Sequence, residues 1–296
     1  MPSASHVQVE KEHVNPERRG LKKGIYLIPS AFTAANIGMG FYAVMAALRG
    51  FQLIEGATAA DLQRAAEQFD NAAKAICWAV LFDMLDGRIA RMTKTTTEIG
   101  VQFDSIADVL TFGIAPAVLA YAWGYGSALM EGSWSHKLGW FISFMYLMCG
   151  AFRLARFNVQ AARPRILAEG TAKVDKKNFI GLPIPPAAAL IAAIIHFAPK
   201  PLLQYQPRYT ALYSGLMMAL VGILGALMVS TIRYSSFKTV GTSSRSTRLA
   251  ILFIAAIGML IYLFSEYALL GLIVIYVLHG PVIRIGGLFR RKGKLA

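Results

Sequence analysis

The sequence predicts an all-α polytopic membrane protein, and three observations support that prediction. Hydrophobic residues make up 56% of the 296-residue chain, and charged residues make up only 16%. A soluble domain usually contains about a quarter charged residues. The mean hydropathy of +0.50 is spread over the whole length rather than gathered in one core. This distribution is typical of a chain that crosses a bilayer several times.

Eight apolar segments are long enough to cross a membrane as helices. Each contains about 17–23 residues, the length that the hydrocarbon core of a bilayer requires of a helix. No internal repeat or separate soluble domain interrupts the series. The segments are residues 29–48, 70–91, 100–122, 137–157, 179–198, 209–231, 248–264 and 267–287.

Three regions follow from this pattern. Residues 1–24 form a polar N-terminal arm, whose basic residues predict a juxtamembrane amphipathic helix from about residue 15 to 28, lying on anionic headgroups. Residues 25–231 hold the first six segments and form the predicted catalytic transmembrane core. Residues 232–296 add two transmembrane helices and a basic C-terminal tail.

The charge distribution predicts the orientation of the chain. A formal net charge of +14 would suggest a nucleic-acid partner in a soluble protein. Here most of the 30 Lys and Arg residues fall in the N-terminal arm, in alternate loops and in the C-terminal tail. Basic loops of membrane proteins face the cytoplasm. We therefore predict an integral protein of a bacterial-type cytoplasmic (inner) membrane, with both termini cytoplasmic and no nucleic-acid partner.

Four aspartates near the ends of the second and third segments are expected to share one pocket. Asp83 and Asp86 are three residues apart, so they lie on one face of a helix. Gly100, Asp104 and Asp108 are four residues apart and form a stripe along the next helix. The hairpin between the two helices is short, which makes them antiparallel neighbours. Their carboxylates should therefore converge near the cytoplasmic surface.

A cluster of four carboxylates predicts a metal site, because like charges this close repel strongly unless cations lie between them. All-oxygen sites suit hard divalent ions such as Mg²⁺ or Mn²⁺, and two such ions can support displacement at phosphorus. The alternative is a set of unrelated acids that pair with Arg88 and Arg91. The cost of inserting acids without a function into a membrane favours the metal site.

Eight residues of this stretch carry a family resemblance through both their identity and their spacing. The chain resembles the CDP-alcohol phosphotransferase family, whose signature it reproduces with the gap lengths included. The resemblance implies a six-helix catalytic core, usually in a homodimer, with two divalent metal ions. The eight residues are Asp83, Asp86, Gly87, Ala90, Arg91, Gly100, Asp104 and Asp108.

The resemblance also implies a role for each of these positions. Asp108 would both touch metal and act as the general base. Gly87 and Ala90 would line the cytidine pocket, and Gly100 belongs to the same nucleotide and diphosphate side. Arg91 would meet the diphosphate or brace the carboxylates. The implied metal ligands are Asp83, Asp86, Asp104 and Asp108.

Two further runs bear on the acceptor alcohol. Residues 152–158 (FRLARFN) place Arg153 and Arg156 on one helical face, and guanidinium groups bind carboxylate or phosphate through two hydrogen bonds. Residues 179–185 (FIGLPIP) open the fifth segment with prolines that free backbone groups to line a polar cavity. The alternatives are a positive-inside anchor for the arginines and an ordinary helix start for the prolines.

These runs resemble the membrane-embedded phosphatidylserine synthases of the same family, from about residue 28 onward. That resemblance implies CDP-diacylglycerol as donor and L-serine as acceptor, with Arg153, Arg156 and Asn158 on the acceptor side. Thr33 and Asn36 become candidates for the nucleotide side. Ser30 departs from the Pro-Asn pattern common in such enzymes, so no role is assigned to it.

Two alternatives to serine transfer stay open from the sequence. One is the same chemistry with glycerol-3-phosphate, an inositol phosphate or choline as acceptor. For the two phosphorylated acceptors, arginines of residues 153–177 could bind the phosphate. The other is a transporter that uses intramembrane acids as a proton or cation relay. The aspartates lie near one face rather than at the midplane and no repeat symmetry is present, which favours the enzyme.

Overall fold

The computed structural model describes residues 16–55, 58–93, 98–162, 178–235 and 258–292. Within this part of the chain the fold is helical apart from two three-residue strands, which confirms the predicted all-α membrane class. The elements are α1 Pro16–Glu55, α2 Ala59–Thr93, α3 Glu98–Asp108, η1 Val109–Ile114, α4 Ala115–Ala120, η2 Tyr121–Tyr125, α5 Trp134–Ala162, β1 Asn178–Ile180, α6 Ile184–Phe197, η3 Leu202–Gln204, α7 Pro207–Val229, β2 Arg233–Ser235 and α9 Ser265–Lys292.

Six stretches of the described chain are long and apolar enough to cross a membrane. They match six of the eight predicted segments. The predicted segment 70–91 lies in α2, which is not among the six because Asp70, Lys74, Asp83 and Asp86 interrupt its apolar run. The predicted segment 248–264 lies largely outside the described residues, and its described part is helical over residues 258–263. The six stretches are Ala31–Glu55, Ile99–Tyr125, Trp134–Val159, Ile184–Gln204, Pro207–Val229 and Ser265–Arg284.

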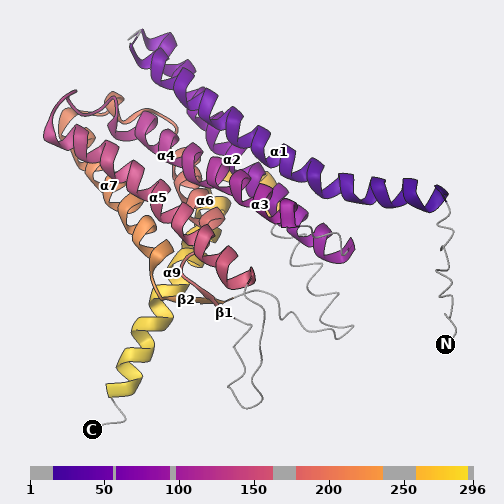
Figure 1. Ribbon diagram of the computed structural model, residues 1–296. Coiled ribbons are helices and arrows are strands. Elements are labelled where there is room, and N and C mark those ends of the chain that lie inside the picture. Colours follow the sequence, from indigo (N-terminus) through magenta and orange to yellow (C-terminus); the bar gives the residue numbers. More distant parts are fainter. Residues whose placement is uncertain (1–15, 56–57, 94–97, 163–177, 236–257, 293–296) are drawn as a thin grey trace, which may run out of the picture.

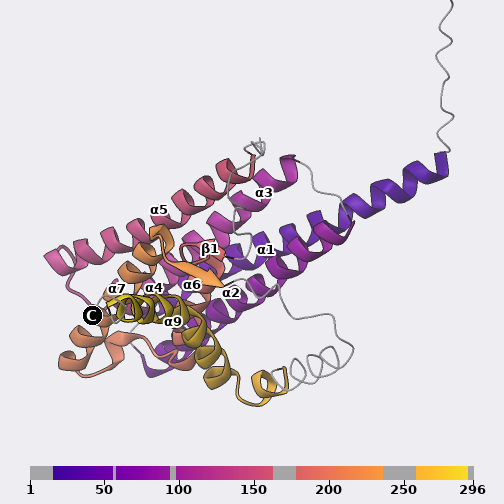
Figure 2. The ribbon, with the colours of Figure 1, turned by 90° about the horizontal axis from the view of Figure 1, so that it is seen from below.

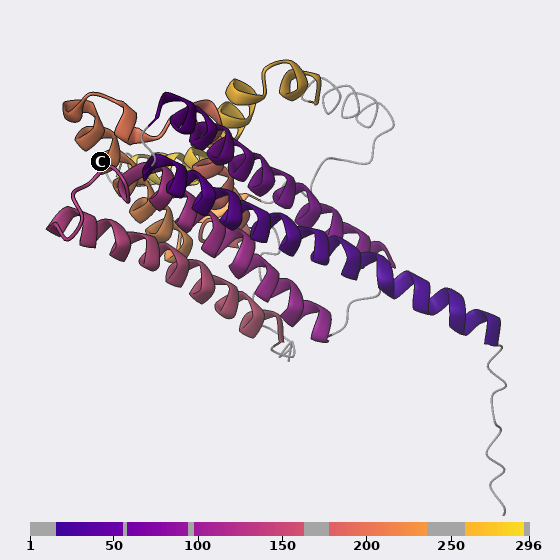
Figure 3. The same cartoon turned by 90° about the horizontal axis from the view of Figure 1, so that it is seen from above.

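Helices α1 and α2 form a long hairpin and lie side by side (Figures 1 and 3). The N-terminal part of α1 extends past its neighbours (Figure 1). The predicted juxtamembrane helix of residues 15–28 is helical from Pro16, and it is continuous with the first span instead of forming a separate element. The hairpin packs through alanines, including Ala43, Ala47 and Ala72, which are fully buried. Small side chains let helices approach closely where lipid gives no hydrophobic drive.

The third span is a composite of α3, η1, α4 and η2, and its helical hydrogen-bonding pattern changes directly after Asp108. Residues Val109–Ile114 and Tyr121–Tyr125 are π-helical. This form is rare overall, and where it occurs it often lies at a functional site. Thr111, Phe112 and Gly113 of the first π-helical turn are buried. The composite span therefore anchors Asp108 in the interior of the bundle.

Gly40 permits the close approach of α1 to η1. A Cβ atom at Gly40 would lie 2.8 Å from the Cα of Thr111, which is nearer than real Cβ contacts come. Gly38, one half-turn away, would meet nothing within 4 Å. The two glycines therefore differ in steric demand although they share one helix.

Replacing Gly40 with alanine is expected to destabilise the protein by about 1–3 kcal/mol, the usual cost of forcing extra volume into a packed contact. Gly38→Ala is the matched control, and it should leave stability unchanged or raise it, because alanine favours helix over glycine. Thermal unfolding in detergent measures both variants. Equal unfolding temperatures for the two would show that Gly40 does not set the distance between α1 and η1.

The two strands join segments that are far apart in sequence. β1 pairs with β2 in antiparallel register, with Phe179 opposite Tyr234. This corrects the predicted fifth segment, which was expected to be helical from residue 179, whereas α6 begins at Ile184. The physical reason is that Pro183 takes an extended conformation before α6 and a proline follows in the first turn, since proline favours a helix start and disrupts a helix interior. β2 in turn packs against α9 (Figure 1).

Candidate active site

Three carboxylates from two helices meet at one point of the bundle. Asp83 of α2 and Asp104 and Asp108 of α3 each offer an oxygen, and these oxygens lie within 4.8 Å of one another. Asp83 and Asp104 are half-buried, while Asp108 is only 8% exposed. Helix α2 ends at Thr93 and α3 begins at Glu98, and the four-residue spacing aligns Asp104 with Asp108 along α3. The structure thus brings together three of the four predicted aspartates.

Asp86, the fourth, lies beside this cluster and faces α1. Its Oδ2 accepts a hydrogen bond from the hydroxyl of Thr33, and both side chains are buried. Its charge still acts on Asp104 and Asp108 electrostatically. Thr33, predicted on the nucleotide side, therefore fixes the direction in which the Asp86 carboxylate points.

Asn36 lies one turn after Thr33 and is almost completely buried. Its backbone oxygen accepts a hydrogen bond of 3.1 Å from the hydroxyl of Thr111. Its side-chain Nδ2 and Oδ1 have no hydrogen-bond partner within the described residues. A buried amide without partners costs free energy, so the position is suited to a polar ligand. Thr111 itself carried no sequence signal, because a lone threonine in an apolar run reads as core.

Among the described residues, Arg153 of α5 is the cation that acts electrostatically on the buried Asp108. It interacts electrostatically with Asp108 and with Arg156. The Nε of Arg153 and the Oδ1 of Asp108 are both buried, and neither has a hydrogen-bond partner in the described part of the chain. A donor and an acceptor held in this state can both be satisfied by one polar ligand that carries an anionic group and a hydroxyl.

The remaining predicted residues lie around this centre. The Nδ2 of Asn158 donates a 2.8 Å hydrogen bond to Ser105, in a largely apolar groove of about 420 Å³ between α3 and α5. Gly87 and Gly100 are exposed on α2 and α3. The backbones of Ala90 and Arg91 continue α2, and their side chains lie outside the described part of the structure.

The donor set fits a hard divalent cation. Three carboxylate oxygens converge, no sulfur or imidazole stands among them, and the Oδ1 of the buried Asp108 lacks a described partner. Oxygen-only sites of this kind are those that Mg²⁺ and Mn²⁺ prefer. Without a cation the close negative charges would repel each other. Asp86 adds a fourth carboxylate next to the same point.

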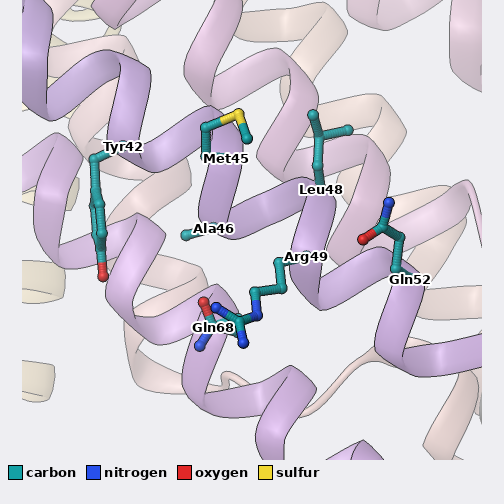
Figure 4. Close-up of a pocket in the computed structure, with 7 residues that line it drawn as sticks. All are labelled: Tyr42, Met45, Ala46, Leu48, Arg49, Gln52 and Gln68. Carbon is teal, nitrogen blue, oxygen red and sulfur yellow. The ribbon is translucent and has the colours of Figure 1, made fainter.

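A second hollow has the wrong chemistry for the same role. Figure 4 shows it on α1 and α2, where Arg49 points toward Gln68 and apolar side chains such as Met45 line the same hollow. Arg49 lies 13 residues beyond Asn36 on α1, which is roughly 20 Å along a helix. The hollow has a lining without carboxylates, so the aspartate cluster is the better candidate for metal-dependent chemistry.

Comparison with known proteins identifies the family to which the chain is similar. Residues 26–220 match the family model described as CDP-alcohol phosphatidyltransferase. The chain is 32% identical over 237 residues to a CDP-diacylglycerol–serine O-phosphatidyltransferase of Helicobacter pylori, covering 79% of this chain and 82% of that protein.

Two further relatives match over a smaller share of each chain. An enzyme of the same name from Saccharomyces cerevisiae is 30% identical over 68% of this chain and 64% of its own. An archaetidylserine synthase of Methanothermobacter thermautotrophicus is 34% identical over 56% and 58%. The matched region contains α2, α3 and the arginines of α5, and on these grounds the chain belongs to the CDP-alcohol phosphatidyltransferase family.

Proposed function

We propose that this protein transfers the phosphatidyl group of CDP-diacylglycerol to L-serine, giving phosphatidylserine and CMP. The observation that carries the proposal is the pair of buried, unpartnered atoms on Asp108 and Arg153, which interact electrostatically. Serine has a hydroxyl for the first and a carboxylate for the second. The names of the relatives in bacteria and yeast, which specify serine, support the same acceptor.

The proposed metal ligands are Asp83, Asp86, Asp104 and Asp108, holding Mg²⁺ or Mn²⁺. Two such ions, when bound, would neutralise the donor's diphosphate and the charge that develops on the leaving group. Asp83 and Asp104 are only half-buried, which is compatible with contact to a bound substrate. Asp86 is oriented by Thr33, and such support of a ligating carboxylate tunes the geometry of a metal site.

In the proposed reaction Asp108 is the general base. Its carboxylate takes the proton of the serine hydroxyl, and the serine oxygen attacks the phosphorus that carries diacylglycerol. The new bond joins that oxygen to phosphorus, and the bond from phosphorus to the CMP oxygen breaks. Arg153, with Arg156 one turn away, holds the serine carboxylate. A single displacement accounts for the products without a covalent enzyme intermediate.

On the donor side, we assign the nucleotide and diphosphate to Gly87, Ala90, Arg91, Gly100, Thr33 and Asn36. The unpartnered amide of Asn36 supports this assignment, because a base or a phosphate oxygen would satisfy it. A largely apolar groove is lined by Ser105 and Asn158, and Ser105 lies on the helix that carries Asp104 and Asp108. We place the aspartate end and both termini in the cytoplasm of a bacterial-type cytoplasmic membrane, and propose a homodimer.

Headgroup analysis of the lipid product tests the proposal. Purified protein is given CDP-diacylglycerol with L-serine, glycerol-3-phosphate, inositol phosphate or choline, each with and without Mg²⁺ or Mn²⁺. We expect phosphatidylserine and stoichiometric CMP in the serine reaction with metal. A product with a different headgroup would refute serine as the acceptor and leave the proposed phosphatidyl transfer intact. Absence of CMP release under all conditions would refute the proposed transferase activity and favour the transporter alternative.

A further inference from the structure

The hollow between α1 and α2 (Figure 4) holds a cation that the proposed reaction does not use. The two helices run side by side in the views from below and from above (Figures 2 and 3). Arg49 of α1 points toward Gln68 of α2, and Gln52 lines the same hollow. Its volume of about 370 Å³ falls within the range of roughly 300–1,000 Å³ that is common for small-ligand sites.

Close packing of the hairpin fixes the two walls of this hollow. Gly50, the residue after Arg49, leaves no room for a side chain, because a Cβ atom there would lie 2.8 Å from the ring of Phe69. Phe69 is fully buried and directly follows Gln68 in the sequence. Because the two backbones are held this closely, the guanidinium and the amide face the same space without any change of fold.

Arg49 has no acidic partner among the described residues. The ion pairs within this part of the chain join other cations to Asp61 and Asp70. The lining of the hollow contains no carboxylate. A guanidinium group makes two parallel hydrogen bonds to a phosphate, so the hollow is suited to an anionic ligand from outside the chain.

The depth of Arg49 in the first apolar span matches the level of lipid phosphates. Arg49 lies 18 residues after Ala31, where that span begins, and the span ends at Glu55. Eighteen residues correspond to about 27 Å along a helix, close to the roughly 30 Å thickness of a bilayer's hydrocarbon core. Thr33, which binds Asp86, lies at the other end of the same span. Arg49 is therefore at the membrane boundary opposite the aspartates.

The side chains around Arg49 are ordered along α1 as the parts of a phospholipid are. One face of α1 carries four exposed side chains at spacings of three and four residues, namely Tyr42, Met45, Arg49 and Gln52. Tyr42 and Met45 lie deeper in the span, at the level of acyl chains. Arg49 and Gln52 lie nearer its end, at the level of headgroups. The face therefore provides apolar contact for a chain and polar contact for its headgroup.

We propose that this hollow binds an anionic phospholipid of the leaflet opposite the aspartate cluster. Arg49 binds the phosphate oxygens through two hydrogen bonds, and the amides of Gln52 and Gln68 complete the headgroup site. One acyl chain lies along Tyr42 and Met45. Basic pockets between transmembrane helices commonly bind anionic headgroups. An arginine that only reached toward water, as arginines near helix ends do, would select no particular lipid.

A second copy of this chain is a poorer occupant for the hollow. A two-fold contact brings the same surface of both chains together. Two copies of Arg49 would then meet without a carboxylate in the lining to separate them, and like charges at close range repel. An anionic lipid supplies the negative charge that this surface lacks.

Native mass spectrometry of the purified full-length protein tests the proposal. Phosphatidylglycerol, phosphatidylcholine and inorganic phosphate are each titrated against the wild type and against Arg49→Gln. We expect the wild type to bind one phosphatidylglycerol per chain saturably, and Arg49→Gln to bind it about 10-fold more weakly, as loss of a charged hydrogen bond implies. Phosphatidylcholine should bind the wild type more weakly because its choline offsets the phosphate charge, and inorganic phosphate because it has no acyl chain.

Two further variants control for charge and for geometry. Arg208 is exposed in the first turn of α7 and lines neither of the two described hollows. Arg208→Gln removes the same charge at another helix end, and it should bind phosphatidylglycerol as the wild type does. Arg49→Lys keeps the charge without the planar fork, so its affinity should lie between those of the wild type and Arg49→Gln.

The unfolding temperature gives a second readout. A lipid that binds only the folded protein stabilises it, so saturating phosphatidylglycerol should raise the unfolding temperature of the wild type by about 3–5 °C. Arg49→Gln should lose most of this rise. Neither measurement depends on catalysis, so failure of the proposed transfer to serine would leave this test unaffected.

Equal affinity of phosphatidylglycerol for the wild type and Arg49→Gln would overturn the proposal. Equal weakening in Arg49→Gln and Arg208→Gln would also overturn it, since it would show only an effect of net charge. Equal wild-type affinity for phosphatidylglycerol and phosphatidylcholine would exclude selection of an anionic lipid. If Arg49→Gln changed the oligomeric state and left lipid binding unchanged, a second copy would occupy the hollow in place of a lipid.

Discussion

Replacing Asp108 with asparagine is expected to lower kcat for CMP release by about 10³-fold or more. Asparagine keeps the size of the side chain and its position on α3, but it cannot accept the proton of the acceptor hydroxyl. A positioned general base usually contributes about 10²–10⁴-fold. Asp108 is also one of the three clustered carboxylates, so the substitution weakens the metal site as well. Release of CMP from CDP-diacylglycerol in the presence of serine measures the effect.

The matched control for this substitution is Glu67→Gln. Glu67 is an exposed carboxylate of α2, and it lies sixteen residues before Asp83 on the same helix. The control should turn over at the wild-type rate, because its carboxylate is far from the cluster. If Asp108→Asn kept kcat within about 10-fold of the wild type, the general base would have to be another group.

The second large effect is expected on removal of divalent metal. Chelation should abolish CMP release, because the diphosphate would then face uncompensated carboxylates. Addition of Mg²⁺ or Mn²⁺ in excess should restore it. A readout independent of activity is the unfolding temperature, which should fall on chelation because the ions stabilise the state that binds them.

A variant separates this effect from non-specific loss of ions. In the double variant Asp83→Asn with Asp104→Asn, two of the three clustered carboxylates are replaced by neutral amides, so the metal ion loses most of its ligands. Its unfolding temperature should be insensitive to chelation. Equal shifts for the variant and the wild type would place the stabilising ion elsewhere in the protein.

The three clustered aspartates could be predicted from the sequence because they lie on consecutive helices. Asp83, Asp104 and Asp108 lie on two helices that follow each other closely in sequence, so their spacing sufficed to predict that they meet. The membrane class followed from composition in the same way, since a bilayer imposes length and polarity on each helix separately.

Features set by long-range contacts could not be predicted. Asp86 turns toward Thr33, 53 residues away, and spacing within α2 alone gives no sign of that partner. The pairing of Phe179 with Tyr234 turned the expected start of a helix into a strand. The packing of α9 on α6 and β2 likewise joins segments that are far apart in sequence.

The central claim is that the clustered carboxylates hold divalent metal, and titration of the purified protein with Mn²⁺ followed by electron paramagnetic resonance tests it most directly. The account predicts saturable binding of about two ions per chain, the number that such phosphoryl-transfer sites use. Asp83→Asn with Asp104→Asn should lose this binding. Weak, unsaturable uptake, or the same stoichiometry in the wild type and the variant, would contradict the account.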